Sequence, residues 1–109
     1  MKPIEFRGTA LDDLREFPGT ARRQAGFELD LVQRGRQPDD WKPVSGIGQG
    51  VQEIRIRDES GAFRVVYVAK FERAIYVLHC FQKKTQKTSK ADLDIARLRF
   101  RDLLRELNR

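Results

Sequence analysis

Residues 63–88 read Phe63-Arg-Val-Val-Tyr-Val-Ala-Lys-Phe-Glu-Arg-Ala-Ile-Tyr-Val-Leu-His-Cys-Phe-Gln-Lys-Lys-Thr-Gln-Lys-Thr88. Two apolar runs, 63–71 and 74–81, flank the polar pair Glu72-Arg73, and this pattern predicts two strands joined by a tight turn. Both runs are apolar at nearly every position. We therefore expect these strands to lie centrally in a sheet that helices cover.

Two further segments alternate polar and apolar residues. Residues 2–7 predict a short strand, and residues 51–58 predict a longer one. Residues 58–61, Asp-Glu-Ser-Gly, connect the longer strand to the next as a hairpin. Residues 36–50 contain two prolines and three glycines, so we expect a loop there.

Three helices are expected. The first begins at the capping box Thr9-Ala-Leu-Asp12 and stops before Pro18. The second covers residues 19–34, in which small and aliphatic residues recur at helical spacing. The third begins at a second capping box, Ser89-Lys-Ala-Asp92, and runs to about Leu107.

The element order β-α-α-β-β-β-α predicts an α+β fold. Two N-terminal helices pack on a mostly antiparallel sheet of about four strands, and a C-terminal helix is added. The 109 residues fit a single domain that spans residues 1–109.

Composition narrows the function classes. The chain has 22 Lys and Arg against 16 Asp and Glu, a net charge of +6, which favours an acidic partner such as nucleic acid. One cysteine and one histidine provide neither a disulfide framework nor a zinc ligand cluster, so we expect no metal and no cofactor. The apolar runs are too short to span a membrane and the N-terminus lacks a signal-peptide pattern, which predicts a cytoplasmic protein without membrane contact.

Strand periodicity sorts the candidates for chemistry. On the last strand, alternation predicts that Ile75, Val77, His79, Phe81 and Lys83 face one way. The other residues of that strand are expected to face the opposite way: Tyr76, Leu78, Cys80 and Gln82.

The basic residues of the preceding strands follow the same rule. Arg55 and Arg57 share one face, opposite the two isoleucines of that strand. Arg64 lies across the hairpin from them. If these arginines face the same side as His79 and Lys83, the sheet presents a basic concave surface.

Such a surface suits RNA. Arginine forks hold phosphate oxygens through paired hydrogen bonds, and an aromatic ring such as Phe81 can stack on an unpaired base. RNA carries its own nucleophile, the 2′-hydroxyl, so cleavage requires no metal. It requires a base, cations for the phosphate and an acid. His79 is the only histidine, the residue type used most often as acid and base.

Each candidate also has a purely structural explanation. His79 suits a half-buried strand residue with a hydrogen bond, and Phe81 suits a core residue. The arginines of residues 51–58 suit a solvated strand face, and the lysines of residues 83–90 suit a soluble loop. Glu53 suits an ion partner for a neighbouring arginine better than a base.

Three segments together resemble the RelE/ParE toxin superfamily, specifically its HigB-like, phage-related branch. They are Val51-Gln-Glu-Ile-Arg-Ile-Arg57, Phe63-Arg-Val-Val-Tyr67 and Val77-Leu-His-Cys-Phe-Gln-Lys-Lys-Thr-Gln-Lys-Thr88. The last is the most specific, because a strand that ends in His-x-Phe-x-Lys-Lys-Thr-x-Lys-Thr before a capped, alanine-containing helix is a signature of that branch. The resemblance covers nearly the whole chain and implies a RelE-like fold.

The resemblance implies the toxin of a type II toxin–antitoxin system, which acts as an endoribonuclease on mRNA in the A site of the 70S ribosome and so inhibits translation. It also implies a cognate antitoxin, typically a helix-turn-helix, HigA-like protein, whose complex with the toxin binds operator DNA.

Family active sites are built from basic residues on the central strands, and the resemblance and the strand analysis point to the same positions. The catalytic candidates are Arg55, Arg57, Arg64, His79 and Lys83. The RNA-binding candidates are Phe81, Lys84 and Lys87.

The chain also departs from the family pattern. Several relatives use a tyrosine near the C-terminus, whereas the two tyrosines here, Tyr67 and Tyr76, lie inside predicted strands. Two alternatives to the nuclease stay open. ParE-like members share the fold and inhibit DNA gyrase without nuclease activity, and a third possibility is a non-catalytic binding or co-repressor protein.

Overall fold

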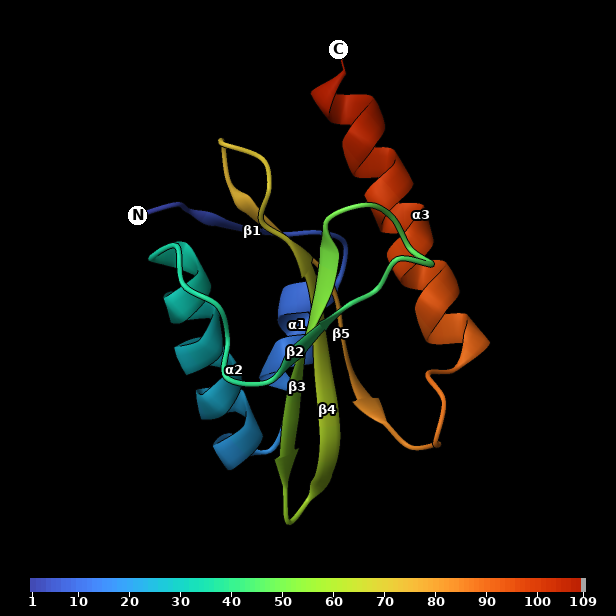
Figure 1. Ribbon diagram of the computed structural model, residues 1–109. Helices are drawn as coiled ribbons and strands as arrows, with labels where there is room; N and C mark the ends of the chain where they lie inside the picture. The colour runs from blue at the N-terminus through green and yellow to red at the C-terminus, as the bar shows by residue number, and fades with distance from the viewer. Residues whose placement is uncertain (109) are drawn as a thin grey trace.

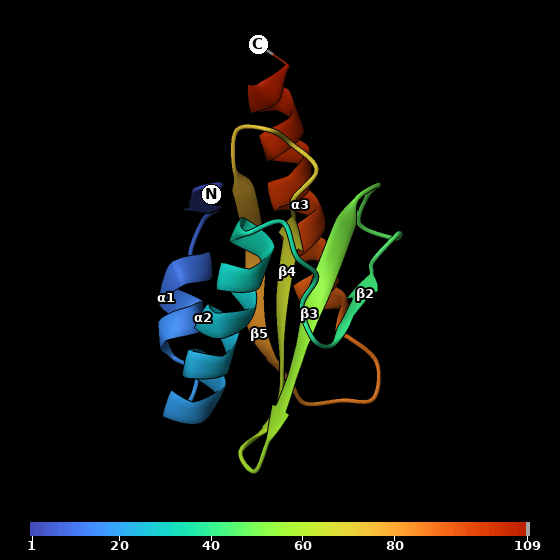
Figure 2. The same cartoon turned by 60° about the vertical axis from the view of Figure 1, so that its left-hand side comes forward.

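A five-stranded sheet separates two helical layers in the computed structural model, which describes residues 1–108 (Figures 1 and 2). The elements in chain order are β1 (Ile4–Phe6), α1 (Ala10–Arg15), α2 (Gly19–Gln33), β2 (Trp41–Pro43), β3 (Val51–Asp58), β4 (Gly61–Val68), β5 (Ile75–Lys83) and α3 (Lys90–Leu107). The strand order is β1-β5-β4-β3-β2, with β1 parallel to β5 and every other pair antiparallel. The predicted α+β class is confirmed, with five strands rather than about four.

The extra strand, β2, lies inside the segment that was expected to be a loop. Trp41 pairs with Ile54 and Pro43 pairs with Gln52, which makes β2 the edge of the sheet. An edge strand tolerates proline because one of its sides needs no ladder hydrogen bond. The expectation of an unbroken loop over residues 36–50 was therefore wrong, since a three-residue strand gives no periodic signal.

The helices α1 and α2 cover one face of the sheet (Figure 2). The apolar stripe of α2 is buried, as its spacing predicted: Ala21, Ala25, Leu29 and Val32. Gly35 follows the helix with φ of 80°, a left-handed conformation that glycine adopts without strain. Each large apolar side chain buried in this layer stabilises the fold by about 1.5–3 kcal/mol.

The start of α1 differs from its prediction. Thr9 occupies the position before the helix, but its side chain makes no capping hydrogen bond to the backbone. Its Oγ1 atom instead donates to Oδ2 of Asp13 at 2.8 Å and accepts a hydrogen bond from Arg99 of α3 at 3.0 Å. The capping box predicted at Thr9 was wrong because this hydroxyl joins two helices.

The helix α3 covers the other face of the sheet (Figure 1). One half of its predicted capping box forms, because Oγ of Ser89 accepts a hydrogen bond from the backbone N–H of Asp92 at 3.1 Å. The carboxylate of Asp92 contacts the hydroxyl of Ser89 and the ring of His79 instead of capping the backbone. The buried residues of α3 are Ala96, Phe100 and Leu103. No helix within residues 1–108 is long and apolar enough to cross a membrane.

A β-bulge interrupts the pairing of β4 with β5. Val66 pairs with His79, whereas the next residue, Tyr67, pairs with Val77, so Leu78 is the extra residue on β5. A bulge of this kind places two residues of one strand opposite one residue of its partner. The side-chain alternation of β5 therefore shifts by one position at Leu78.

The shift overturns the alternation that was predicted for β5. Ile75 and Val77 pack in the cluster under α1 and α2, as does Cys80, which was expected on the opposite face. His79 contacts α3, and Phe81 packs in the cluster under α3. The bulge thus places the side chains of His79 and Phe81 on the α3 face of the sheet. This face also carries the arginines of β3 and β4.

Candidate nucleic-acid interface

The predicted basic residues lie in rows across one face of the sheet. Arg55 of β3 pairs with Arg64 of β4, which pairs in turn with Phe81 of β5. In the adjacent row, Arg57 pairs with Ala62, which pairs with Lys83. Because cross-strand partners point to the same side of a sheet, these candidates share the face of α3.

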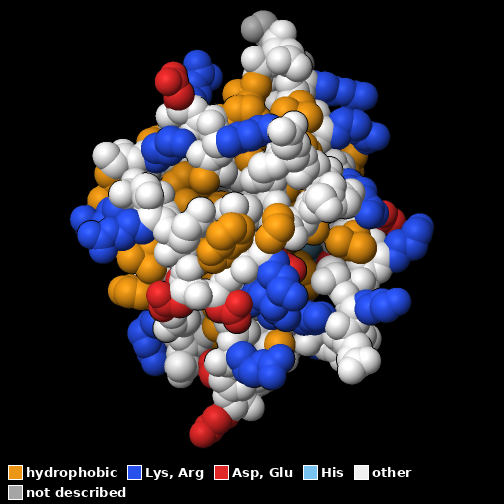
Figure 3. Space-filling model, viewed as in Figure 1, with side chains coloured by type: hydrophobic (Ala, Val, Ile, Leu, Met, Phe, Trp, Pro, Cys, Tyr) orange, Lys and Arg blue, Asp and Glu red, His pale blue; other side chains and the backbone are white. Residues whose placement is uncertain are grey.

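An open cavity of about 290 Å³ lies at the end of the sheet beside the β3–β4 hairpin. Its lining includes Arg55, Arg57 and Arg64, together with Ile56 and Asp40. Figure 3 shows a group of Lys and Arg side chains just below the middle of the view, with acidic side chains beside them and other basic side chains elsewhere on the same face. The structure therefore brings the three predicted arginines together around one opening, and adds a carboxylate that the sequence analysis missed.

Arg64 lies at the back of this cavity. Its side chain is only 4% exposed, its guanidinium donates to the carbonyl of Phe63 at 3.0 Å, and its Nε atom lies 3.3 Å from Oε2 of Glu53. The ion pair confirms the role expected for Glu53. Burial lowers the pKa of Arg64, and the carboxylate of Glu53 opposes that shift. The charges of Arg55 and Arg57 lower this pKa further, while the charge of Asp40 raises it. An anion in the cavity would relieve this repulsion between like charges.

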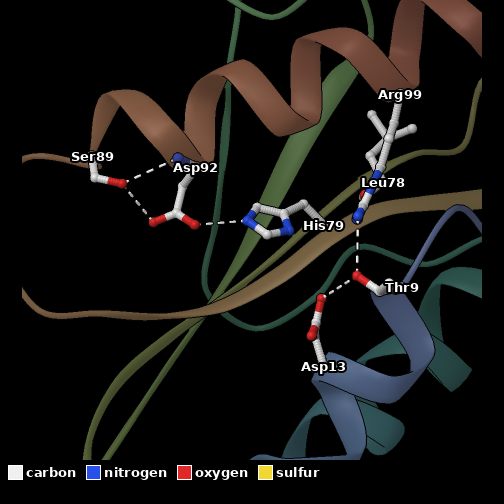
Figure 4. Close-up of polar contacts among 7 residues, drawn as sticks. All are labelled: Thr9, Asp13, Leu78, His79, Ser89, Asp92 and Arg99. Atoms are coloured by element: carbon white, nitrogen blue, oxygen red, sulfur yellow. Dashed lines mark hydrogen bonds and ion pairs between the residues drawn. The ribbon is translucent and has the colours of Figure 1, made fainter.

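His79 lies beneath α3, away from solvent. Its Nε2 atom is 2.7 Å from Oδ1 of Asp92 (Figure 4). Its ring stacks on Phe81 with centroids 4.9 Å apart. The residue is 5% exposed, and its buried Nδ1 atom has no hydrogen-bond partner among residues 1–108. His79 is thus closed off from solvent in this conformation, and its partner is Asp92, which the sequence identified only as a helix cap.

The helix α3 also holds the bulge. The guanidinium of Arg99 donates to the carbonyl of Leu78 at 2.9 Å, and the same group reaches Thr9 (Figure 4). The extra residue of a bulge loses its ladder partner, so its carbonyl needs another donor. Arg99 supplies that donor. This hydrogen bond therefore ties α3 to the bulged part of β5, next to His79.

Two of the three predicted lysines, Lys83 and Lys84, line a second opening on this face. This cavity of about 190 Å³ is lined in part by Phe81, Lys83, Lys84 and Asp92. Lys83 is half-buried and Lys84 is exposed. Lys87 is exposed in the loop that follows and lines neither opening.

A larger cavity, about 370 Å³, lies on the α2 side of the sheet. Its lining includes Lys2, Val32 and Tyr67, and none of the candidate residues contributes to it. Burial raises the pKa of the Tyr67 hydroxyl, which donates to Gln52 at 2.7 Å. We therefore place the candidate site on the opposite, arginine-bearing face.

Comparison with known proteins supports the fold and identifies the family. The family described as "Phage derived protein Gp49-like (DUF891)" matches residues 12–101. The structure of a double mutant of the E. coli toxin RelE in the free state superposes with a TM-score of 0.63 at 18% sequence identity, covering 85% of this chain and 95% of that one. No curated protein sequence matches this chain. The chain therefore belongs to the phage-derived Gp49-like family of RelE/HigB-type toxins and has the RelE fold.

Proposed function

We propose that this chain is a ribosome-dependent mRNA endonuclease, the toxin of a type II toxin–antitoxin system. The observation that supports the proposal best is the cavity lined by Arg55, Arg57 and Arg64. Three guanidinium groups around an opening of about 290 Å³ provide paired donors for the oxygens of a phosphate. The toxin family of the chain makes mRNA the substrate to test first.

Each candidate takes a role in this chemistry. Arg55, Arg57 and Arg64 bind the scissile phosphate and neutralise the charge that develops in the transition state. Phe81, half-buried between the two openings, stacks on a base. Lys83 adds a positive charge from the neighbouring row of the sheet. The exposed residues Lys84 and Lys87 contact RNA outside the cavity.

His79 is the candidate acid or base of the sequence analysis, and its surroundings set a condition on that role. The ring is 5% exposed, and its Nε2 atom is held by Asp92. His79 can exchange a proton with RNA only if the contact between β5 and α3 opens. A fixed α3 would leave His79 as a structural residue.

The proposed partners follow from the family. A cognate, helix-turn-helix antitoxin neutralises the toxin, and the complex binds operator DNA. The mRNA and the 70S ribosome are the partners of the free toxin in the cytoplasm. We propose that residues 1–109 act as one domain that needs no metal or cofactor, because the 2′-hydroxyl of the substrate is the nucleophile.

The proposal is tested by expressing the protein in bacterial cells and mapping the 5′ ends of their mRNA. Wild type should produce cuts inside translated codons that carry 5′-hydroxyl ends, the product of attack by the 2′-hydroxyl. Arg57→Ala and Lys83→Ala should lose most of these cuts. Arg23→Ala, which removes an exposed arginine of α2 on the other side of the sheet, should retain them.

Other outcomes separate the alternatives. Growth arrest with intact mRNA and inhibited supercoiling would favour a gyrase inhibitor. Normal growth without cleavage would favour a binding or co-repressor protein. Cuts that carry 5′-phosphate ends would contradict the 2′-hydroxyl mechanism.

A further inference from the structure

Asp40 extends the row of charged residues across the sheet. The backbone N–H of Arg55 donates to the carbonyl of Asp40 at 2.9 Å, next to the pair formed by Trp41 and Ile54. Asp40 therefore stands opposite Arg55 and on the same face as Arg55 and Arg64. It lines the 290 Å³ cavity with them, so a carboxylate at the edge of the sheet faces the guanidinium groups.

The carboxylate of Asp40 is accessible and is not held by another side chain among residues 1–108. Asp40 is exposed, and within residues 1–108 its side chain enters none of the hydrogen bonds and ion pairs that engage the other acidic groups near the site. Glu53 is held by Arg64 at 3.3 Å, and Asp92 is held by His79 at 2.7 Å. Among the residues that the structure describes, Asp40 is also the only acidic one in the cavity lining.

The placement is unfavourable for binding alone. A negative charge beside a phosphate weakens its attraction to the arginines, so a surface that only gripped RNA would gain by lacking it. An ionised carboxylate can accept a proton, and the proposed reaction needs a proton acceptor beside the phosphate. His79 does not reach the cavity in this conformation, because its ring is buried under α3.

We propose that the carboxylate of Asp40 is the general base of the cleavage reaction, an inference that rests on the proposed nuclease function. The 2′-hydroxyl of the nucleotide held by the arginines transfers its proton to Asp40 as its oxygen attacks the phosphorus. The bond from phosphorus to the 5′ oxygen then breaks, and that oxygen takes up a proton from a second group or from water. The products are a 2′,3′-cyclic phosphate and a 5′-hydroxyl.

A different role for Asp40 would be to hold the arginines in place. The two roles predict different results for Asp40→Asn, which keeps the shape of the side chain and removes its charge. Loss of a base lowers the cleavage rate and leaves RNA binding equal or tighter. Loss of a positioning group weakens RNA binding together with the rate.

The experiment uses purified full-length protein, 70S ribosomes and a short mRNA positioned in the A site. Single-turnover cleavage and the affinity for the ribosome complex are measured for wild type, Asp40→Asn and Asp40→Glu. Asp39→Asn is the matched control, because Asp39 is the adjacent exposed aspartate, lies outside the cavity lining, and is held through its backbone N–H by Glu28 at 2.8 Å. Thermal unfolding of each variant checks that the fold is intact.

For Asp40→Asn we expect a rate about 100-fold to 10,000-fold lower than wild type, the usual contribution of a general base, with unchanged or tighter binding. Asp40→Glu should recover part of the rate, and Asp39→Asn should cleave like wild type. Cleavage by Asp40→Asn within a few-fold of wild type would overturn the assignment while the nuclease function stands. Parallel losses of rate and affinity would overturn it in favour of a positioning role. Wild type that fails to cleave would overturn the nuclease function itself, and the role of Asp40 with it.

Discussion

The Nε2 atom of His79 lies 2.7 Å from Oδ1 of Asp92, which joins the last strand of the sheet to the first turn of α3. Ser89 donates from its hydroxyl to the other carboxylate oxygen at 2.7 Å, so the aspartate is held from two sides (Figure 4). The only histidine of the chain is thereby fixed beneath the helix that covers this face. We expect this contact to set both the stability of α3 and the accessibility of His79.

Replacing Asp92 by alanine should destabilise the protein by about 1–3 kcal/mol, because the buried imidazole then loses its partner. The free energy of unfolding is measured by urea denaturation for Asp92→Ala, His79→Ala and the double variant. The two single effects should not add, since both remove the same contact. Asp94→Asn is the control, because its ion pairs lie on the exposed side of α3 and should contribute less than about 1 kcal/mol. Additive single effects would show that the two residues are not coupled.

A matched pair of glycines tests the packing of the β2–β3 loop against α3. A Cβ atom at Gly48 would lie 2.1 Å from the ring of Phe100, whereas a Cβ atom at Gly46 would meet its nearest neighbour at 3.7 Å. Gly48→Ala should therefore destabilise the protein by about 1–3 kcal/mol through overpacking. Gly46→Ala should have little effect or stabilise slightly, because alanine restricts the unfolded chain. Equal midpoints of thermal unfolding for the two variants would contradict this packing.

The arrangement of α1, α2, α3 and the central strands follows from patterns that a single sequence displays. Capping residues, proline and apolar stripes mark the helices, and continuous apolar runs mark β4 and β5. The bulge at Leu78 leaves no such mark, because residues 74–81 are apolar on both faces and alternation carries no information there. Its position depends on Arg99, a residue of α3 that supplies the donor for the carbonyl of Leu78 at 2.9 Å.

The candidate site likewise contains residues whose positions the sequence predicts and one whose position it does not. Arg55 and Arg57 could be predicted because they alternate with isoleucines on β3, and Arg64 because it lies across the hairpin. Asp40 could not, because its place beside Arg55 depends on the pairing of β2, a strand of three residues with a proline. Backbone hydrogen bonds between β2 and β3 set the position of Asp40. The spacing of residues along the sequence does not reveal that strand pairing.

Glu28 gives a prediction for the pH dependence of stability. This residue is buried on α2, and its carboxylate accepts hydrogen bonds from Gln24 and from the backbone N–H of Asp39, each at 2.8 Å. Burial raises the pKa of its carboxyl group, while the backbone hydrogen bond acts in the opposite direction. The folded state thus holds the proton more tightly than the unfolded chain. The associated stability is present below the unfolded pKa and is lost as the pH rises through the folded one.

Glu28→Gln cannot ionise, so it should not show this loss. Its free energy of unfolding should rise relative to wild type as the pH increases from about 4, near the ordinary pKa of glutamate, towards neutrality. Urea denaturation at several pH values measures the difference. Glu16→Gln, which replaces an exposed glutamate just after α1, should follow wild type throughout. A difference between Glu28→Gln and wild type that stays constant or shrinks with pH would show that the charged form is not disfavoured.

The arginine cavity predicts how RNA binding depends on salt. Each phosphate contact made by a cation to single-stranded nucleic acid contributes about −0.7 to the slope of log affinity against log salt concentration. Arg57 is exposed and lines the cavity, so Arg57→Ala should weaken binding of a short single-stranded RNA and make the slope about 0.7 less steep. Arg23→Ala removes the same charge from α2 on the far side of the sheet and should leave the slope unchanged. Fluorescence anisotropy at several salt concentrations gives both slopes. If the two variants changed the slope equally, attraction to the net charge rather than a phosphate contact in the cavity would account for binding.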